Sequence, residues 1–456
     1  MAKMQKLEGM TPTQVVDALG RYIMGQEDAR KAVAVAVRNR ARRRMVPDEI
    51  RDEIAPKNII MIGPTGVGKT EIARRLSALT GAPFIKVEAT KYTEVGYVGR
   101  DVESMIRDLA TTAITLVKRE HQKEVQLKAA KAAEDILLDI LFPVSVSGGR
   151  GSSENSDEQE RVFNTTREKM QKKLQNGELE EKTVEIEVES GNSGPVFDVL
   201  ASSGLEGMDI NFQEMLSNIM PQRTRSRKMR VEEARRVLMQ QEMEKLIDME
   251  RVTEEALHRV EEMGIVFIDE IDKIAGRESR QGPDVSREGV QRDILPIIEG
   301  CTVKTRYGPV KTDHILFIAA GAFYVNQPAD LIPELQGRFP IRVQLSPLSH
   351  ADFKRILTRP RNALIKQYQA LMLTEGVELK FDNSGIDEIA RIAEDYNNRT
   401  ENIGARRLHT LMERLLEDLS FRAPEMQGET LLINRAYVKE KLSGLLEHRD
   451  VSSYIL

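Results

Sequence analysis

Residues 58–71 read Asn-Ile-Ile-Met-Ile-Gly-Pro-Thr-Gly-Val-Gly-Lys-Thr-Glu, and this stretch constrains the fold more than any other part of the chain. An apolar run of strand length precedes a glycine-rich turn and a helical pattern that Gly81 and Pro83 end. Residues 63–70 match the phosphate-binding loop, Gly-x-x-x-x-Gly-Lys-Thr, in the strand–loop–helix setting that the motif requires. In such a loop, backbone N–H groups and the helix N-terminus surround a phosphate. The segment therefore predicts a nucleotide site in an α/β fold.

Two side chains of this loop are expected to bind phosphate and metal, and a second motif supplies carboxylates for the metal and the attacking water. Lys69 is expected to reach the β- and γ-phosphates, and the Thr70 hydroxyl to bind Mg²⁺. Far along the chain, residues 264–272 read Gly-Ile-Val-Phe-Ile-Asp-Glu-Ile-Asp. The apolar part predicts a buried strand that delivers Asp269 to the Mg²⁺ shell, while Glu270 can polarise the attacking water. ATP and Mg²⁺ are therefore the predicted cofactors.

Composition limits the class of protein. With 456 residues, 40% hydrophobic and 30% charged, the chain has the make-up of a globular protein of about two to four domains. A net charge of −5 argues against a dedicated nucleic-acid binder, and one cysteine excludes a disulfide framework and a multi-cysteine zinc site. Residues 1–8 lack the apolar core of a secretion signal, and no run approaches the ~18 apolar residues of a membrane span. We expect a cytoplasmic protein without a membrane partner.

The distance between the two motifs predicts an insertion. Residues 1–110 and 258–345 hold both motifs and are expected to form the nucleotide-binding domain, interrupted by a mostly helical domain over 111–257. Within the insertion, Val184, Ile186 and Val188 alternate as a short strand, and a basic run over 223–236 is read as the solvated flank of a long helix.

The last part of the chain, residues 346–456, is predicted to be a helical C-terminal domain. Two Ser-x-x-Asp patterns, at 349–352 and 384–387, predict helix starts. The final triplet, Tyr454-Ile455-Leu456, follows a polar stretch and leaves two interpretations open. It packs on its own domain or docks on a partner.

Several segments have ordinary interpretations on their residues alone. Residues 96–99, Gly-Tyr-Val-Gly, fit a structural turn. Arg338, after a polar turn, and Arg406, near a helix start, fit solvated surface charges. The apolar strand at 315–318 runs into Ala319-Ala320-Gly321, which offers no polar side chain to orient a water.

The motifs taken together resemble the HslU family (also called ClpY), the hexameric AAA+ unfoldases that work with the HslV peptidase. The resemblance covers the whole chain and rests on five segments in the family's order: residues 63–71, 96–99, 265–272, 337–338 and 404–407. It implies a doubly wound α/β core with a parallel sheet and flanking helices. It also implies an inserted, mostly helical I domain and a helical C-terminal domain with a short sheet.

The resemblance also assigns roles to residues. Nucleotide contacts carry over to Met24, Gly66, Val67, Gly68, Lys69, Thr70, Glu71, Asp269, Glu334 and Arg406. Thr70 and Asp269 would hold Mg²⁺, Asp269 through water, with Glu270 catalytic and Arg338 entering from the neighbouring subunit. Gly96, Tyr97, Val98 and Gly99 would form the pore loop that grips protein substrates. Tyr454, Ile455 and Leu456 would dock on the HslV-type peptidase.

Three alternatives remain from the sequence. A ClpX-like unfoldase shares Gly-Tyr-Val-Gly, but normally has a cysteine-rich zinc domain that one cysteine cannot supply. A nucleic-acid motor, such as a clamp loader or a branch-migration ring, shares the two nucleotide motifs, and the acidic balance weighs against it. A scaffold that binds nucleotide without turnover is disfavoured by the presence of both Glu270 and Arg338.

Overall fold

The computed structural model describes residues 10–51, 53–54, 56–93, 100–142, 156–189, 224–276 and 287–447. The chain divides into two compact units. The first comprises Met1–Leu116 together with Thr253–Leu456, and the second is Val117–Val252. The second unit is therefore an insertion in the sequence of the first.

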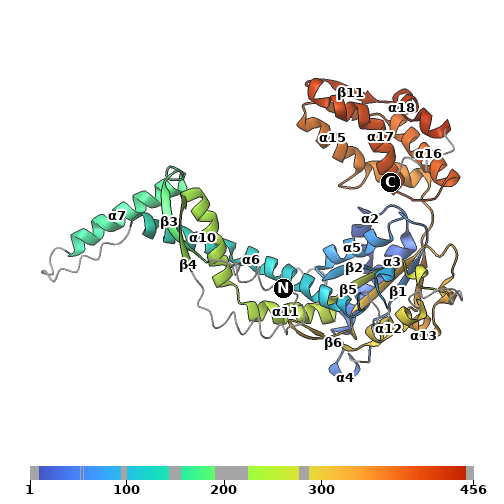
Figure 1. Cartoon of the computed structure of the whole chain (residues 1–456), viewed down its shortest axis with the longest axis horizontal. Coiled ribbons are helices and arrows are strands. Elements are labelled where there is room, and N and C mark those ends of the chain that lie inside the picture. Colours follow the sequence, from blue (N-terminus) through green and yellow to red (C-terminus); the bar gives the residue numbers. More distant parts are fainter. Residues whose placement is uncertain are drawn as a thin grey trace, which may run out of the picture. The chain divides into compact units, whose positions relative to one another are not determined.

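A five-stranded parallel sheet forms the centre of the first unit (Figure 1). In spatial order its strands are β2 (Phe84–Glu88), β5 (Ile265–Asp269), β8 (Leu316–Gly321), β1 (Ile59–Ile62) and β9 (Ile341–Gln344). Strands β1, β5 and β8 are nearly continuous apolar runs, as expected of parallel strands covered on both faces. The predicted parallel α/β core is confirmed.

The register of the sheet determines where a ligand can bind. Ile62 at the end of β1 pairs with Gly321 at the end of β8, and Ile268 of β5 pairs with Ala319. The segments that follow these strands therefore meet at one edge of the sheet, where α/β proteins bind ligands. The helices that accompany the sheet are α2 (Pro12–Gly20), α3 (Glu27–Arg43), α5 (Lys69–Thr80), α12 (Arg287–Glu299) and α13 (Pro333–Arg338).

The C-terminal part of the first unit is helical and contains a small parallel sheet. Its helices are α14 (His350–Thr358), α15 (Leu364–Thr374), α16 (Asn383–Arg399), α17 (Arg406–Arg422) and α18 (Arg435–Glu447), and its strands are β10 (Glu378–Phe381) and β11 (Thr430–Ile433). Ser349 caps α14 through a capping box with Asp352, as predicted. The second predicted cap is wrong: Asp382, not Ser384, begins α16, because its carboxylate accepts the Gly385 N–H at 2.6 Å.

The inserted unit contains most of a long helix and a two-stranded antiparallel sheet. Helix α6 (Ser104–Leu141) runs into it and is followed by α7 (Ser156–Gln175), β3 (Thr183–Glu189), β4 (Thr224–Arg230), α10 (Val231–Leu246) and the start of α11 (Met249–Met263). Although α6 has 38 residues, neither it nor any other helix in the described ranges is apolar enough to cross a membrane.

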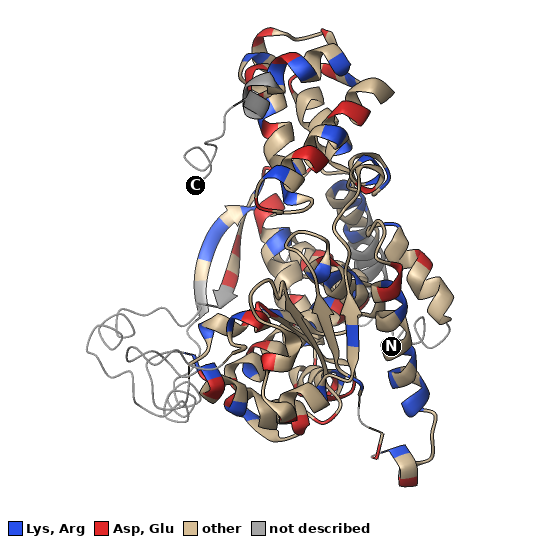
Figure 2. Ribbon diagram, turned by 90° about the vertical axis from the view of Figure 1, so that its right-hand side faces the viewer, with Lys and Arg blue, Asp and Glu red and all other residues tan. Residues whose placement is uncertain are grey.

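The basic run was predicted to be a helix flank, and its first part is instead strand β4. Its partner β3 carries acidic residues where β4 carries basic ones (Figure 2). In the register of the two strands, Glu185 lies opposite Lys228. Cross-strand pairs of opposite charge stabilise such a sheet, while Met229 packs into the core beside Val184. The strand is therefore specified by a partner that lies about 40 residues earlier, which local periodicity does not reveal.

Candidate functional site

The phosphate loop joins β1 to α5 in the predicted order, with Gly68 as the N-cap of α5. Gly66 and Gly68 have φ values of 75° and 104°, in the left-handed region that favours glycine. A Cβ on Gly66 would lie 2.0 Å from the carbonyl oxygen of Ile403, so a side chain there would displace the backbone. The loop and the N-terminus of this 12-residue helix together provide N–H groups and partial positive charge for a phosphate.

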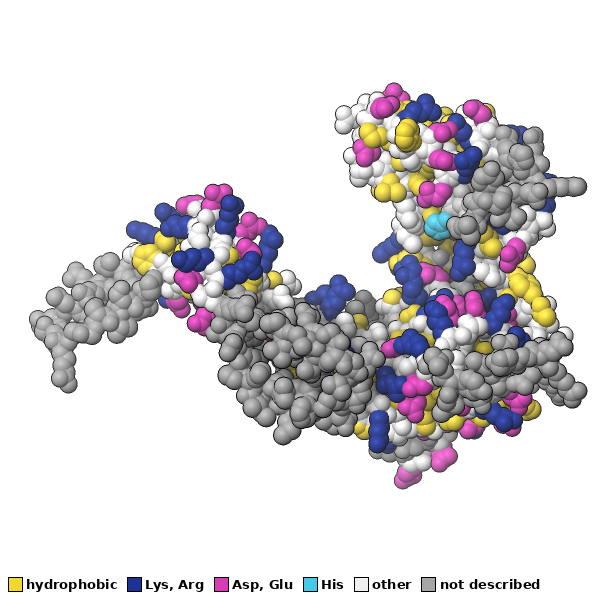
Figure 3. Space-filling model, viewed as in Figure 1, with side chains coloured by type: hydrophobic (Ala, Val, Ile, Leu, Met, Phe, Trp, Pro, Cys, Tyr) yellow, Lys and Arg dark blue, Asp and Glu magenta, His cyan; other side chains and the backbone are white. Residues whose placement is uncertain are grey.

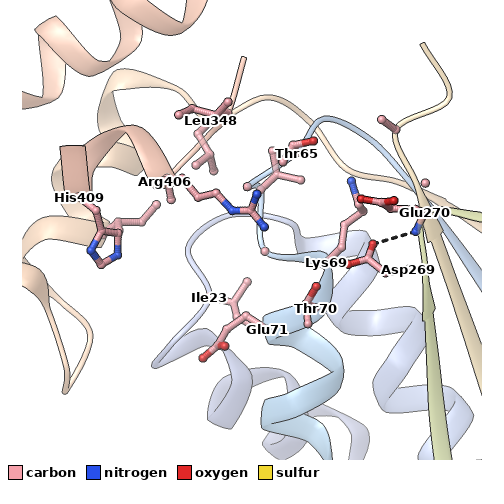
Figure 4. Close-up of a pocket in the computed structure, with 18 of the residues that line it drawn as sticks. Ile23, Thr65, Lys69, Thr70, Glu71, Asp269, Glu270, Leu348, Arg406 and His409 are labelled. Carbon is pink, nitrogen blue, oxygen red and sulfur yellow. Dashed lines mark hydrogen bonds between the residues drawn. The ribbon is translucent and has the colours of Figure 1, made fainter. Parts of the chain in front are cut away.

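Lys69 is the buried cation of this loop (Figure 4). Its ammonium donates to the carbonyl of Pro64 at 2.8 Å and to that of Gly63. Burial lowers the pKa of Lys69, and the nearby carboxylates of Asp269 and Asp272 oppose that shift. A nucleotide's phosphates would give this desolvated ammonium stronger partners than neutral carbonyls, which favours phosphate binding.

Asp269 and Glu270 extend from the end of β5 toward the same place. Lys86 of β2 forms an ion pair with Asp269, with 2.8 Å between Nζ and Oδ2. Asp269 also accepts the backbone N–H of Glu270 at 3.1 Å, the dashed line of Figure 4. Glu270 is exposed and has a φ of 56°, an uncommon conformation for glutamate of the kind often found at active sites. One carboxylate is thus held by a lysine, and the other faces the cavity.

These groups surround a cavity of about 870 Å³, within the usual range for small-molecule sites. Arg406 at the start of α17 aims its guanidinium toward the phosphate loop, beside Thr65 (Figure 4). The Ala405 N–H donates to the Gly66 carbonyl at 3.0 Å, which ties α17 to the loop. The predicted site residues that line the cavity are Met24, Gly66, Val67, Gly68, Lys69, Thr70, Glu71, Asp269, Glu270 and Arg406.

Sequence reasoning missed other parts of the cavity wall. Tyr22, Leu348, Ile356 and Leu364 supply apolar surface suited to a nucleotide base, and His409 of α17 also lines the cavity. The apolar members belong to patterns that also describe core residues, so no sequence signal distinguishes them.

The end of β8 has no polar side chain, as expected from Ala319-Ala320-Gly321. A polar group nevertheless reaches the cavity a few residues later. Asn326 lines the cavity, and its amide donates to the carbonyls of Asp272 at 2.9 Å and Ala275 at 2.8 Å. Asn326 therefore ties the loop after β8 to the turn that follows Glu270.

Two predicted site residues do not line this cavity. Glu334 and Arg338 both lie on α13, where Glu334 is exposed. Arg338 forms an ion pair with Glu299 at 2.9 Å, and 48% of its side chain is exposed. The structure thus does not bring these two residues to the nucleotide cavity of their own chain.

Two further predicted sites lie outside the described residues. These are the pore loop, Gly96, Tyr97, Val98 and Gly99, and the docking tail, Tyr454, Ile455 and Leu456. Their roles stay predictions.

The donor set of the cavity fits Mg²⁺. The part of the chain that the structure describes contains no cluster of three or more His, Cys, Asp or Glu residues able to hold a metal. Mg²⁺ does not need one, because it usually takes one or two protein oxygens with substrate phosphates and water. The Thr70 hydroxyl and the Asp269 carboxylate, both at the cavity wall, are oxygen donors of this kind.

The site has the features of an AAA-type ATPase. A phosphate loop and a carboxylate pair lie at the ends of parallel strands, and the helical C-terminal part supplies an arginine. Family models agree: an AAA domain of the Cdc48 subfamily matches residues 195–342, and one of the dynein-related subfamily matches residues 58–139.

Full-length relatives identify the family. The chain is 57% identical to the ATP-dependent protease ATPase subunit HslU of Persephonella marina over 453 residues, which cover 99% of this chain and 100% of that protein. It is 54% identical to HslU of Thermotoga maritima (99% of this chain, 100% of that protein) and 56% identical to HslU of Halalkalibacterium halodurans (98% and 99%). The chain belongs to the HslU family of ATP-dependent protease ATPase subunits.

Proposed function

We propose that this chain forms a homohexameric ring that uses ATP to unfold proteins, translocates them into an HslV-type peptidase and activates that peptidase. The observation that carries the proposal is the assembled nucleotide cavity in a chain that matches HslU proteins over almost its entire length. The test is ATP-dependent degradation of a stably folded protein by this chain together with an HslV-type peptidase. ATPase activity stimulated by DNA, without unfolding, would contradict it.

The residues of the cavity suit distinct tasks in ATP hydrolysis. Lys69 and the loop N–H groups bind the phosphates, and Arg406 adds positive charge from α17. Mg²⁺, held by Thr70 and, through water, by Asp269, would neutralise charge on the phosphate oxygens. Glu270 accepts a proton from the attacking water or orients it.

Arg338 and Glu334 are proposed to act on the neighbouring subunit's nucleotide. They are four residues apart on α13 and therefore lie on one face of the helix. Because neither lines its own cavity, a subunit boundary is the arrangement that brings them to a nucleotide.

The remaining assignments are proposals about organisation. We assign 1–110 and 258–345 to the nucleotide-binding domain, 111–257 to the I domain and 346–456 to the C-terminal domain, and we place the protein in the cytoplasm. Positive and negative side chains intermingle over the described C-terminal helices in the face shown in Figure 3. Such mixing, with a net charge of −5, favours protein substrates over nucleic acid.

Replacing Tyr97 tests the pore loop. We expect Tyr97→Ala to retain most ATPase activity and to lose degradation of folded substrates, because the aromatic ring grips the polypeptide and does not contact nucleotide. ATP hydrolysis and degradation of a folded protein are measured in parallel, with Tyr97→Phe as the control that keeps the ring. Equal loss of both activities in Tyr97→Ala would show that the segment is a structural turn.

Removing the tail tests docking. Deletion of residues 450–456 is expected to leave basal ATPase activity and ring assembly intact and to abolish peptidase activation, because three apolar side chains worth roughly 1.5–3 kcal/mol each lose their partner pocket. A synthetic peptide of the tail should activate the peptidase weakly by itself. The Ser452→Ala/Ser453→Ala chain is the control and should activate normally. Unfolding of the truncated chain, or parallel loss of ATPase activity, would mean that the tail packs on its own domain.

A further inference from the structure

The helix that carries Arg338 is too short to hold its own position. Helix α13 has six residues, Pro333–Arg338, and the side chain of its N-cap residue, Ile332, makes no capping hydrogen bond. Isolated helices shorter than about 12–15 residues are marginal in water, so packing and hydrogen bonds from neighbouring elements must fix α13. Helix α12 lies beside it (Figure 1).

At its N-terminal end, α13 is held by Gln291 of α12. The Gln291 side chain is 1% exposed, and its carbonyl oxygen accepts the N–H of Ile332, the N-cap of α13, at 2.8 Å. Its amide nitrogen donates to the carbonyl of Ile274 at 2.7 Å. Ile274 closes the short 3₁₀ turn that follows Glu270, so one buried amide joins the Arg338 helix to the catalytic turn.

At its C-terminal end, the helix is held by Asn58. This side chain is 4% exposed, and its amide nitrogen donates to the backbone carbonyl of Arg338 itself at 3.1 Å. Its oxygen accepts the N–H of Phe317 in β8 at 3.0 Å. Asn58 immediately precedes β1, the strand that leads into the phosphate loop.

Both amides therefore use a donor and an acceptor, and each connects α13 to an element of the nucleotide site in the same chain. Loss of either amide would take the bonding partner from one buried backbone group, the Ile274 carbonyl or the Phe317 N–H, and from one part-buried group of α13 or its N-cap, which favours the bridged arrangement. The Arg338 side chain remains half exposed and able to change partner, while its backbone is fixed.

We propose that Asn58 and Gln291 are positioning residues that fix α13 relative to the nucleotide site of its own chain and thereby determine how Arg338 reaches the neighbouring subunit's nucleotide. This inference rests on the proposed role of Arg338 across the subunit boundary. It assigns to two buried amides an effect on catalysis in the next subunit, and neither amide lines the cavity of its own chain.

The test begins with Gln291→Met, which keeps side-chain length and removes both hydrogen bonds. We expect homogeneous rings of this variant to bind ATP with unchanged affinity and to lose about 10²-fold in kcat, the size of effect expected when a catalytic group is misplaced by about 1 Å. The matched control is Gln369→Met, which removes a side-chain hydrogen bond to the Leu379 carbonyl in the C-terminal part and should keep kcat within a few-fold.

Mixed rings show whether Gln291 affects the nucleotide site of its own chain or that of the neighbouring subunit. In rings that combine Gln291→Met with Lys69→Ala chains, the variant's own site receives an intact Arg338 from its neighbour, so activity should return. In rings that combine Gln291→Met with Arg338→Ala chains, the intact site of the second chain meets a displaced arginine, so activity should stay low. The opposite pattern, rescue by Arg338→Ala chains and none by Lys69→Ala chains, would overturn the proposal by placing the defect in the variant's own site.

Controls distinguish this failure from failure of the proposed function. Mixed Lys69→Ala and Arg338→Ala rings must regain activity; if they stay inactive although chains exchange, the action of Arg338 across the boundary is wrong and the positioning role is lost with it. If Gln291→Met does not fold, Asn58→Leu is used in the same mixing experiment, because it removes the hydrogen bonds at the other end of α13. If neither variant folds, the amides are folding elements and the proposal is overturned.

Discussion

Glu270→Gln is expected to leave ATP binding intact while hydrolysis falls by a factor on the order of 10²–10⁴, the usual cost of losing a general base. Glutamine has the shape of glutamate and can adopt the same backbone conformation, so the geometry at Asp269 is kept. The lost group is the carboxylate that extends from the end of β5 into the cavity. Steady-state phosphate release and equilibrium binding of a fluorescent ATP analogue measure the two effects separately.

A matched change elsewhere in the cavity provides the control. Glu401→Gln makes the same carboxylate-to-amide substitution at a residue that lines the cavity near Arg406 and is remote from the β5 carboxylates in sequence. Its kcat should stay within a few-fold of the wild type. Turnover of the Glu270→Gln chain in that same range would remove Glu270 from the chemical step.

The sequence predicts the centre of the site because local rules specify each part of it. The strand, the glycine loop and the helix of residues 58–80 are contiguous, and the left-handed φ values at Gly66 and Gly68 explain why glycine occupies those positions. Asp269 follows directly from a continuous apolar strand. Parallel pairing then brings the ends of β1, β5 and β8 to one edge without further information.

The parts that the sequence did not predict depend on contacts between distant segments. The β4 strand needs β3, about 40 residues earlier in the chain, as its partner. Gln291 lies in an amphipathic helix, where a polar residue predicts a solvated face, yet it is buried because two backbone groups from other elements meet it. Pairings of this kind are properties of the assembled fold.

For Glu334 and Arg338, the structure of a single chain does not show the nucleotide contacts that the family resemblance predicts. The family resemblance places both at a nucleotide, and the structure places both away from the nucleotide cavity of their own chain. The two statements agree if, as we propose, a second copy completes the site. A ring with head-to-tail interfaces provides such an arrangement, because each copy then offers α13 to one neighbour and its cavity to the other.

Arg338→Ala is expected to assemble and bind ATP normally and to lose about 10³–10⁵-fold in kcat, the range reported for arginines that stabilise a transferring phosphoryl group. The ion pair with Glu299 is half exposed, so its loss should change the free energy of unfolding by no more than about 1 kcal/mol. Arg342→Ala, which replaces an exposed arginine on the neighbouring strand β9, is the matched control and should hydrolyse ATP within a few-fold of the wild type.

Mixed rings test whether Arg338 acts across the subunit boundary. When Arg338→Ala and Lys69→Ala chains are mixed in equal amounts, about one interface in four pairs an intact site with an intact arginine, so about a quarter of wild-type activity should return. Mixed rings that stay inactive despite demonstrated chain exchange would show that Arg338 does not act across the boundary.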